Sequence, residues 1–339
     1  MISAFAAFLI SWMLNHMLAG VRSSSPLAVL DIPNERSMHR KPIPRTGGLG
    51  ILGAMLPLFV WTAARSFYPA PLILLALGVL LVGAVSFWDD RTGTPVGLRL
   101  AVQAIAAILM FGAGFRVPPI GALAALPEWA RLALSLAVFL WGINLYNFMD
   151  GMDGLAGGMG VIGFATLALF GGRIGYEPFF VVNAIIAMAA LGFLAFNFPP
   201  ARLFMGDVGS ASLGLLMVAN SLWGLRAGCY PPWVPLVIFS PFIVDASVTL
   251  LRRIVRREPV WRAHKTHYYQ RLVGLGWSHQ KTLLCEYALM VFASLSAWFG
   301  AMRPPVAQLG ILTAWIVVYL LLAGAVPWLE WRKSRRERR

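Results

Sequence analysis

Residues 70–88 read APLILLALGVLLVGAVSFW and are followed directly by Asp89 and Asp90. This uncharged apolar run is long enough to cross a hydrocarbon core about 30 Å thick as a single α-helix. Two adjacent carboxylates at the end of such a helix lie where the membrane meets water. The rest of the chain repeats this pattern of apolar runs closed by short polar loops, and that repetition decides the predicted fold.

The composition belongs to a membrane protein. Of 339 residues, 59% are hydrophobic and 12% are charged, and the mean hydropathy is +0.72, whereas a soluble domain has about 25% charged residues. We therefore predict an all-α integral membrane protein with about eleven transmembrane helices. The expected spans are 2–21, 47–64, 70–88, 98–115, 130–148, 155–172, 178–198, 210–226, 230–251, 282–302 and 305–329.

The basic residues give the spans an orientation. With eleven spans, 22 of the 28 Lys and Arg fall on one side of the membrane. Cytoplasmic loops carry the excess of Lys and Arg, so we expect the N-terminus outside and the C-terminus in the cytoplasm. This topology also explains the formal net charge of +14, and we expect no nucleic-acid partner.

Five carboxylates gather at the predicted cytoplasmic ends of spans, in the turns FWDDRTG, NLYNFMDGMDGLAGG and FMGDVGS. They are Asp89, Asp90, Asp150, Asp153 and Asp207. Each turn contains glycine, which lets a ligand approach the backbone closely. Mg²⁺ prefers oxygen ligands and often binds one or two carboxylates plus substrate phosphates. The pattern therefore predicts a divalent-cation site, although any single carboxylate is equally well explained as solvated or paired with arginine.

Two basic loops accompany these acids: DIPNERSMHRKPIPRTGGLG at 31–50 and RRIVRREPVWRAHKTHYYQRL at 252–272. Arg and Lys bind pyrophosphate oxygens through charge-assisted hydrogen bonds. For the arginines of 252–257, anionic lipid head groups are the favoured partners. His264 and His267 are expected to hydrogen bond to substrate oxygens rather than to hold a metal.

Five segments occur in a recognisable order. They are D-x-P-x-x-R-S-x-H-x-x-P-x-P-R-x-G-G at 31–48, the Asp89–Asp90 pair, N-x-x-N-x-x-D-G-x-D-G-L-A at 144–156, N-x-x-P-A-R-x-F-M-G-D-x-G-S at 197–210, and H-x-x-H at 264–267. From Asp31 to about Leu272 the chain resembles the polyprenyl-phosphate N-acetylhexosamine-1-phosphate transferases, a glycosyltransferase family 4 type. That family includes the phospho-MurNAc-pentapeptide transferase of peptidoglycan synthesis and the enzymes that initiate O-antigen lipids.

The resemblance implies an enzyme of the bacterial inner membrane, with its active site facing the cytoplasm. It would transfer HexNAc-1-phosphate from a UDP-N-acetylhexosamine to undecaprenyl or another polyprenyl phosphate and release UMP. Mg²⁺ is the implied cofactor, with Mn²⁺ as an alternative. The expected partners are the two substrates, membrane lipids and, as an open alternative, a second copy of the chain in a homodimer. Residues 1–331 would form a single transmembrane catalytic domain, followed by a basic cytoplasmic tail at 332–339.

The resemblance also assigns residues. Asp89, Asp90 and Asp207 match catalytic positions, and Asp207 and Asn147 match metal-binding positions. The matched substrate-binding positions are Arg45, Arg99, Asn144, Asn147, Asp150, Asp153, Arg202, His264 and His267. For Asp89 two roles stay open, a base or orienting group for the lipid phosphate and a covalent nucleophile; we favour the first, because an ionised phosphate is already a nucleophile. Arg99 stands where many relatives carry lysine.

Two alternatives compete with this reading. H-K-T-H at 264–267 favours the branch that initiates O-antigen, the first membrane step of lipopolysaccharide, or another surface polysaccharide; the alternative is the phospho-MurNAc-pentapeptide transferase. A non-enzymatic transporter of lipid-linked sugars predicts ionisable groups near the bilayer midplane, but only Asp245 and Glu286 lie inside spans, each near an end. Because Asp245 belongs to no motif, we expect Asp245→Asn to leave substantial turnover.

Overall fold

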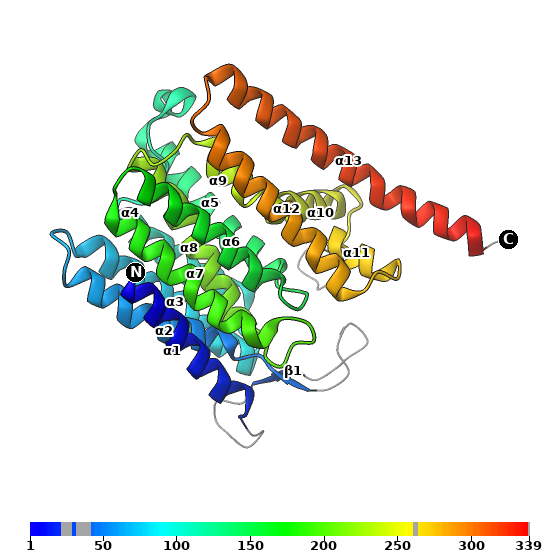
Figure 1. The fold of residues 1–339 in the computed structure, drawn as a ribbon, viewed down its shortest axis with the longest axis horizontal. Coiled ribbons are helices and arrows are strands. Elements are labelled where there is room, and N and C mark those ends of the chain that lie inside the picture. The colour runs from blue at the N-terminus through cyan, green and yellow to red at the C-terminus, as the bar shows by residue number, and fades with distance from the viewer. Residues whose placement is uncertain (22–28, 32–41, 260–263, 338–339) are drawn as a thin grey trace. The chain divides into compact units, whose positions relative to one another are not determined.

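The computed structural model describes residues 1–21, 29–31, 42–259 and 264–337. Within these ranges the chain forms thirteen α-helices, one short 3₁₀ helix, η1 (Gly121–Ala125), and one antiparallel pairing between β1 (Leu30–Asp31) and β2 (Ile43–Pro44). The prediction of an all-α membrane protein is confirmed (Figure 1). Most of the first motif, at 32–41, and residues 260–263 of the second basic loop lie outside the described residues.

Eight helices are long and apolar enough to cross a membrane. They are α1 (Ile2–Ala19), α3 (Ala70–Thr92), α5 (Glu128–Phe148), α6 (Leu155–Arg173), α7 (Glu177–Asn197), α8 (Gly206–Arg226), α12 (His279–Gly300) and α13 (Pro305–Glu337). Two further apolar helices, α2 (Gly47–Ala63) and α4 (Val96–Gly112), have 17 residues each. Ten of the eleven expected spans therefore correspond to single helices.

The remaining expected span, 230–251, consists of two helices. Helix α9 (Trp233–Ile238) ends before Phe239, and α10 (Ser240–Val255) begins directly after it. Pro241 lies in the first turn of α10, where its missing N–H group needs no partner. In an uninterrupted helix the same proline would remove a hydrogen bond and clash with the preceding turn. The apolar run was thus identified correctly, but the break at Phe239 was not.

The N-terminal unit, residues 1–33 and 39–231, is built around α8. Of the 18 most apolar consecutive residues in this helix, 89% are buried. Helices α3 and α5 pack against it most extensively, and α2, α6 and α7 also contact it. Around this centre α1 packs on α7 and α2, and α4 on α3 and α5. The long connections are thereby held at the ends of a helical bundle.

Two glycines let α2 and α8 approach closely. A Cβ atom on Gly48 would lie 2.2 Å from the backbone nitrogen of Gly209. The backbone N–H groups of Gly47 and Gly48 donate to the carbonyl oxygens of Phe204 and Met205 at 2.9 and 2.8 Å. The start of α2 is therefore fixed against the start of α8. This packing brings Arg45, two residues before α2, next to the FMGD turn at 204–207.

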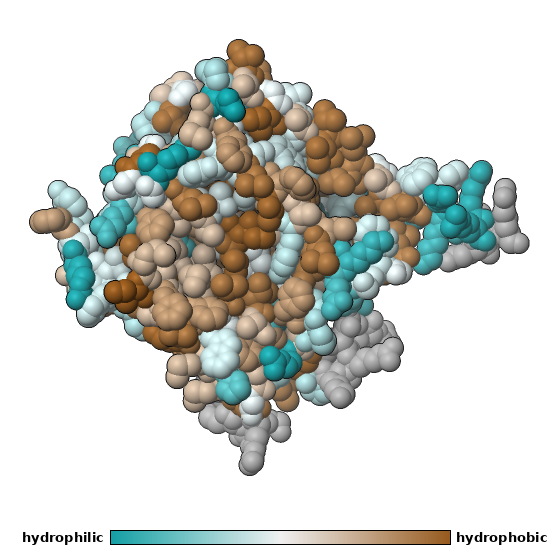
Figure 2. All heavy atoms as spheres, viewed as in Figure 1, coloured by the Kyte–Doolittle hydropathy of each residue, from teal (hydrophilic) through white to brown (hydrophobic). Residues whose placement is uncertain are grey.

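The C-terminal unit comprises the described residues from 232 onward. Helix α12 packs against α9, α10 and the short helix α11 (Tyr268–Gly274), and α13 contacts α9, α11 and α12. Of the 18 most apolar consecutive residues in α13, only 6% are buried within the protein. Hydrophilic side chains gather at its C-terminal end, whereas apolar side chains cover much of the visible face in Figure 2. Helix α13 continues to Glu337 and so includes most of the basic tail.

Candidate active site

Three carboxylates and two arginines meet where α3, α4 and α8 end or begin. One Arg45 nitrogen, Nη2, lies 2.7 Å from Asp90 Oδ1 and 3.5 Å from Asp207 Oδ1. Arg99 Nη1 lies 2.5 Å from Asp89 Oδ2 and 3.7 Å from Asp207 Oδ2. These five residues are called the acid–arginine cluster below. Asp207 is the central member, because its two carboxylate oxygens face different arginines.

Backbone contacts fix the carboxylates of the acid–arginine cluster. Asp89 Oδ1 accepts a hydrogen bond from the Thr94 N–H group at 2.5 Å, and Asp90 Oδ2 accepts one from the Asp207 N–H group at 3.2 Å. Gly206 has φ +69°, and a Cβ atom there would lie 2.2 Å from the carbonyl oxygen of Arg45. The turn before Asp207 thus needs glycine for its backbone conformation and for space.

The charges of the cluster do not balance. With every group ionised, three carboxylates face two guanidinium groups, which leaves one formal negative charge in excess. The Asp90 side chain is only 2% exposed, so water screens it poorly. A site of this kind attracts a cation, and the arginines hold the carboxylates apart from one another. The same guanidinium groups have the geometry to bind phosphate oxygens.

Asn147 and Asp150 lie beside the cluster. Asn147 Oδ1 accepts a hydrogen bond from Ser210 Oγ at 2.6 Å, and the Asn147 side chain also interacts with the Asp207 carboxylate. Burial raises the pKa of Asp150 well above its ordinary value, and the negative charge of Asp207 raises it further. This effect places the Asp150 carboxyl within the electrostatic range of the cluster.

The chemistry of the donors fits a Mg²⁺ ion. The Asp207 carboxylate and the Asn147 amide are both oxygen donors, and they interact with each other. Mg²⁺ is commonly bound through one or two carboxylates, with water and substrate phosphates completing its octahedron. No group of three or more His, Cys, Asp or Glu with metal-binding geometry occurs in the described part of the chain. The site suits an ion that the substrate helps to bind, rather than an ion enclosed by protein ligands alone.

Three predicted substrate-binding residues make other contacts. Asn144 Nδ2 donates to Gln103 Oε1 at 2.8 Å and so joins α5 to α4. Asp153 Oδ2 accepts from the Ala201 N–H group at 3.0 Å. The guanidinium of Arg202 lies over the Phe196 ring, 5.2 Å from its centroid. No hydrogen bond or ion pair found among the described residues joins any of the three to the acid–arginine cluster.

Asn197 connects two of the motif loops. Its Oδ1 atom accepts from the Gly154 N–H group at 2.8 Å, and its Nδ2 atom donates to the Leu203 carbonyl at 2.9 Å. The loop between α5 and α6 is thereby tied to the loop before α8. Sequence reasoning missed this role, as it missed Ser210, although both residues stand within quoted motifs.

His264 and His267 belong to the C-terminal unit, where a buried carboxylate holds the second of them. Asp245 Oδ1 accepts hydrogen bonds from His267 Nδ1 at 3.1 Å, from the Tyr268 N–H group at 3.0 Å and from Thr249 Oγ1 at 3.0 Å. Its Oδ2 atom accepts from the Tyr269 N–H group at 3.4 Å. Because a carboxylate only accepts, His267 carries a proton on Nδ1. Asp245 therefore fixes both the ring and the start of α11, a role that no motif indicated.

His264 has a different environment. Its Nδ1 atom lies 2.9 Å from Thr266 Oγ1 and accepts a long hydrogen bond from the Thr266 N–H group at 3.4 Å. Burial, with further effects of His267 and Arg253, lowers the pKa of His264 to about 4. His264 is therefore neutral near pH 7.

Comparison with known proteins identifies the family of the chain. Residues 72–225, which contain the whole acid–arginine cluster except Arg45, match the family model described as glycosyl transferase family 4. The chain is 32% identical over 314 residues to a decaprenyl-phosphate N-acetylglucosaminephosphotransferase of Mycobacterium tuberculosis, covering 81% of this chain and 77% of that protein. The chain belongs to glycosyl transferase family 4. Its membership identifies it as a phosphosugar transferase of the membrane.

Two other family members show the range of relatives. A probable undecaprenyl-phosphate N-acetylglucosaminyl 1-phosphate transferase of Bacillus subtilis is 29% identical over 310 residues, covering 88% of this chain and 85% of that protein. A phospho-N-acetylmuramoyl-pentapeptide-transferase of Thermosynechococcus vestitus is 30% identical over 290 residues, covering 76% and 73%. The family resemblance read from the motifs is confirmed. These relatives do not single out O-antigen initiation.

Proposed function

We propose that this family 4 enzyme transfers N-acetylhexosamine 1-phosphate from a UDP-linked sugar to a polyprenyl phosphate at the cytoplasmic face of the membrane. The observation that carries the proposal is the acid–arginine cluster, with Asp207 between Arg45 and Arg99. Both substrates are phosphates, and the cluster combines cation-binding carboxylates with phosphate-binding guanidinium groups. The names of the relatives in B. subtilis and M. tuberculosis favour N-acetylglucosamine as the sugar.

The proposed reaction is a direct displacement at phosphorus. An oxygen of the polyprenyl phosphate attacks the β-phosphorus of the UDP-sugar, and the bond from that phosphorus to the bridging oxygen of the diphosphate breaks. UMP leaves with the bridging oxygen, and the lipid keeps a diphosphate-linked sugar. Such a transfer needs mainly alignment of the two phosphates and neutralisation of their charge.

The two arginines have separate roles in this proposal. Arg99 binds the attacking lipid phosphate, and Arg45 binds the diphosphate of the donor. Both guanidinium groups are held by carboxylates, Arg45 by Asp90 and Arg99 by Asp89. These ion pairs keep the guanidinium groups in place before the phosphates arrive, which lowers the entropy lost on binding.

Mg²⁺ is the proposed cofactor, with Mn²⁺ as an alternative. Asp207 and Asn147 would hold it, with Asp90 and Asp150 adding negative charge nearby. When bound, the ion would neutralise diphosphate charge and stabilise the departing UMP.

The contacts of Asp89 favour an orienting role. Its carboxylate is already bound to the Arg99 guanidinium and to the Thr94 N–H group. Both carboxylate oxygens of Asp89 are thus already engaged, one by the backbone and one by Arg99. Asp89 is therefore proposed to align Arg99, and through it the lipid phosphate, rather than to remove a proton or form a covalent intermediate.

The test is a transfer assay with the purified full-length protein, UDP-N-acetylglucosamine labelled in the sugar, undecaprenyl phosphate and Mg²⁺. We expect label in the organic extract and an equal amount of UMP in the aqueous phase. Glu128→Gln is the matched control, since Glu128 begins α5 at the end opposite Asn147 and pairs with Arg116; it should keep wild-type turnover. Labelled lipid without UMP would refute the proposal, and so would the absence of both products with this donor and with the competing donor described next.

The donor sugar is tested in the same assay. UDP-MurNAc-pentapeptide is the competing donor, because one relative is a phospho-N-acetylmuramoyl-pentapeptide-transferase. We expect UDP-N-acetylglucosamine to be the better donor by turnover divided by Michaelis constant. Preference for the pentapeptide donor would move the enzyme to peptidoglycan synthesis and would keep the proposed chemistry. O-antigen initiation, the pathway predicted from the histidine segment, needs a further test with cells that lack this enzyme.

A further inference from the structure

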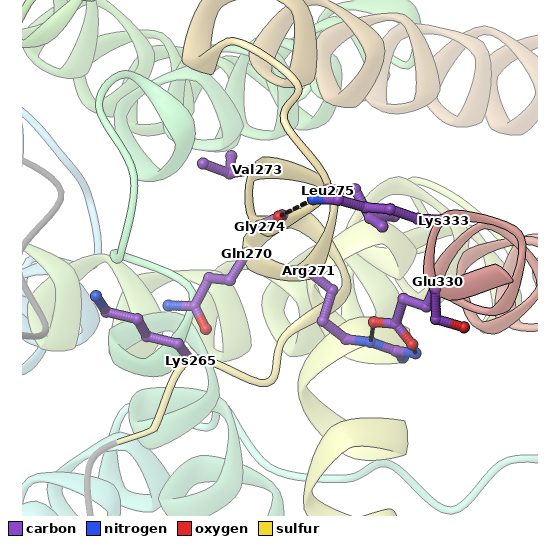
Figure 3. A pocket seen from close by; sticks show the side chains of 9 residues that line it. Lys265, Gln270, Arg271, Val273, Gly274, Leu275, Glu330 and Lys333 are labelled. Carbon is purple, nitrogen blue, oxygen red and sulfur yellow. Dashed lines mark hydrogen bonds and ion pairs between the residues drawn. The ribbon is translucent and has the colours of Figure 1, made fainter. Parts of the chain in front are cut away.

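The C-terminal unit contains a cavity of about 570 Å³ between α11, the segment before it and the end of α13 (Figure 3). Its polar lining comes from Lys265, Gln270, Arg271, Glu330, Lys333 and Ser334. None of these residues belongs to the acid–arginine cluster. The cavity lies wholly within one compact unit of the chain.

Positive charge dominates the cavity. Lys265, Arg271 and Lys333 oppose the single carboxylate of Glu330. Arg271 donates to both oxygens of Glu330, at 2.8 and 2.7 Å, and Figure 3 shows the two side chains facing each other. Arg252 and Arg256, at the end of α10, are close enough to act electrostatically on the same carboxylate. An anion in the cavity would therefore meet a net positive potential.

Arg271 and Lys333 would act on an anion in different ways. The Arg271 side chain is only 8% exposed, and its Nη1 atom is fully buried, so Arg271 contributes positive charge rather than a direct hydrogen bond. Among the described residues, Lys333 Nζ makes one long hydrogen bond, 3.4 Å, to the carbonyl of Gly274, and an ammonium group has three N–H donors.

The cavity lies at the end of a membrane span. Trp328 and Trp331, on either side of Glu330, are 53% and 52% exposed. The guanidinium of Arg332 lies over the Trp328 ring and that of Arg335 over the Trp331 ring. Exposed tryptophans next to arginines mark the level of the lipid head groups. The preceding turns of α13 expose leucines such as Leu320 and Leu321, which provide an apolar surface for acyl chains.

We propose that this cavity binds the phosphate head group of an anionic phospholipid, with the acyl chains along α13. The phosphate would take a hydrogen bond from Lys333 and lie near the positive charge of Arg271, and the excess positive charge selects anionic over zwitterionic lipids. A soluble phosphate would gain the same polar contacts without the apolar ones. This proposal does not depend on the proposed catalytic function.

The test uses the delipidated full-length protein in an uncharged detergent. Dioctanoyl phosphatidylglycerol, dioctanoyl phosphatidylcholine and inorganic phosphate are titrated separately, and binding is followed by native mass spectrometry. We expect saturable binding of the phosphatidylglycerol, with clearly weaker binding of the other two. Equal affinities for both lipids would overturn the proposal. Inorganic phosphate binding as tightly as phosphatidylglycerol would overturn the lipid assignment in favour of a free-anion site.

Variants locate the site. Lys333→Gln should weaken phosphatidylglycerol binding about fivefold, as expected for one cation at a membrane surface, and Lys333→Arg should restore it. The matched control is Lys281→Gln, because Lys281 lies in the same unit over the Trp277 ring and does not line the cavity. Equal losses in Lys333→Gln and Lys281→Gln would overturn the proposed site. Retention of affinity in Lys333→Arg excludes misfolding as the cause of the loss.

Discussion

The acid–arginine cluster and the surroundings of Asp245 use buried carboxylates in different ways. In the cluster, three carboxylates share two arginines, and one negative charge is left over. Asp245 instead accepts four hydrogen bonds from Thr249, His267 and the first backbone N–H groups of α11. The cluster keeps a formal negative charge that the proposed cation would neutralise, whereas Asp245 is satisfied by the protein itself. The difference supports a substrate-binding role for the cluster and a positioning role for Asp245.

Asp207→Asn should have the largest effect, because Asp207 is the carboxylate between the two arginines. We expect turnover to fall about 10³-fold, the upper range for the loss of one charge-stabilising group, and the Mg²⁺ concentration needed for half activity to rise. The measurement is UMP release over a titration with Mg²⁺. A variant with wild-type turnover and an unchanged metal requirement would refute the metal assignment. Glu128→Gln again serves as the control.

Removal of the metal tests the charge imbalance of the cluster directly. Without a divalent cation, the diphosphate would meet a net negative site, so excess EDTA should abolish UMP release. Added Mg²⁺ should restore it, and added Mn²⁺ should restore it in part. Full activity in EDTA would contradict this prediction and would give the carboxylates another role.

Asp89→Asn should lower turnover about 10²-fold, the lower end of the range for a lost acid–base or orienting group. Asparagine keeps the contact with Thr94 but weakens the ion pair with Arg99. Because the proposed mechanism has no covalent intermediate, residual turnover should remain. A decisive observation would be UMP released in an amount equal to the enzyme when polyprenyl phosphate is absent. That result would favour a covalent intermediate on Asp89.

Asp245→Asn tests the positioning role of the second buried carboxylate. The sequence predicts substantial turnover, because Asp245 belongs to no motif. The structure predicts some loss of turnover, because Asp245 orients His267. We expect about a tenfold loss, the low end for a residue that orients another functional group. In the variant, the ¹⁵N resonances of labelled histidine should show a mixture of His267 rings protonated on Nδ1 and rings protonated on Nε2. Asp245→Glu should restore part of the Nδ1 signal, and an unchanged His267 resonance in Asp245→Asn would count against the positioning role.

The smallest expected effect is the contribution of the His264 ring to the pH dependence of stability. Its pKa of about 4 lies below the ordinary value of 6.5, so the folded protein binds fewer protons than the unfolded chain between these values. Stability contributed by the neutral ring should therefore be complete above pH 6.5 and should fall as the pH drops toward 4. An NMR titration should show the His264 ring neutral from pH 6 to 8. A midpoint near 6.5 would contradict the buried environment.

The sequence predicted much of the fold and part of the site for identifiable physical reasons. Apolar runs predicted ten spans as single helices, because span length and hydropathy are local properties. The break at Phe239 depends on where Pro241 falls in a helix turn, which an apolar run does not indicate. Charged residues of the motifs were placed correctly at span ends. Their pairing was not predictable, because Arg45 and Asp90 meet only through the packing of α2 on α8.

The assignments from motifs were least informative where a side chain hydrogen bonds to backbone groups. Asn197 and Asp153 hold loops together through N–H and carbonyl groups, and a motif does not distinguish such contacts from substrate binding. Asp245 shows the reverse case, since three of its four hydrogen-bond partners lie more than twenty residues away along the chain. Among these residues, Asp245 is the one whose role the Asp245→Asn measurements test.

The fate of the β-phosphorus tests the central claim most directly. The purified protein is given UDP-N-acetylglucosamine labelled with ³²P at the β-phosphate, together with undecaprenyl phosphate and Mg²⁺, and the label is followed into the organic and aqueous phases. Attack on the β-phosphorus at the acid–arginine cluster predicts that the ³²P enters the lipid and that the released UMP is unlabelled, with both signals lost in Asp207→Asn and kept in Glu128→Gln. Labelled UDP in the aqueous phase, with unlabelled lipid, would contradict it, because the sugar would then have moved without its phosphate.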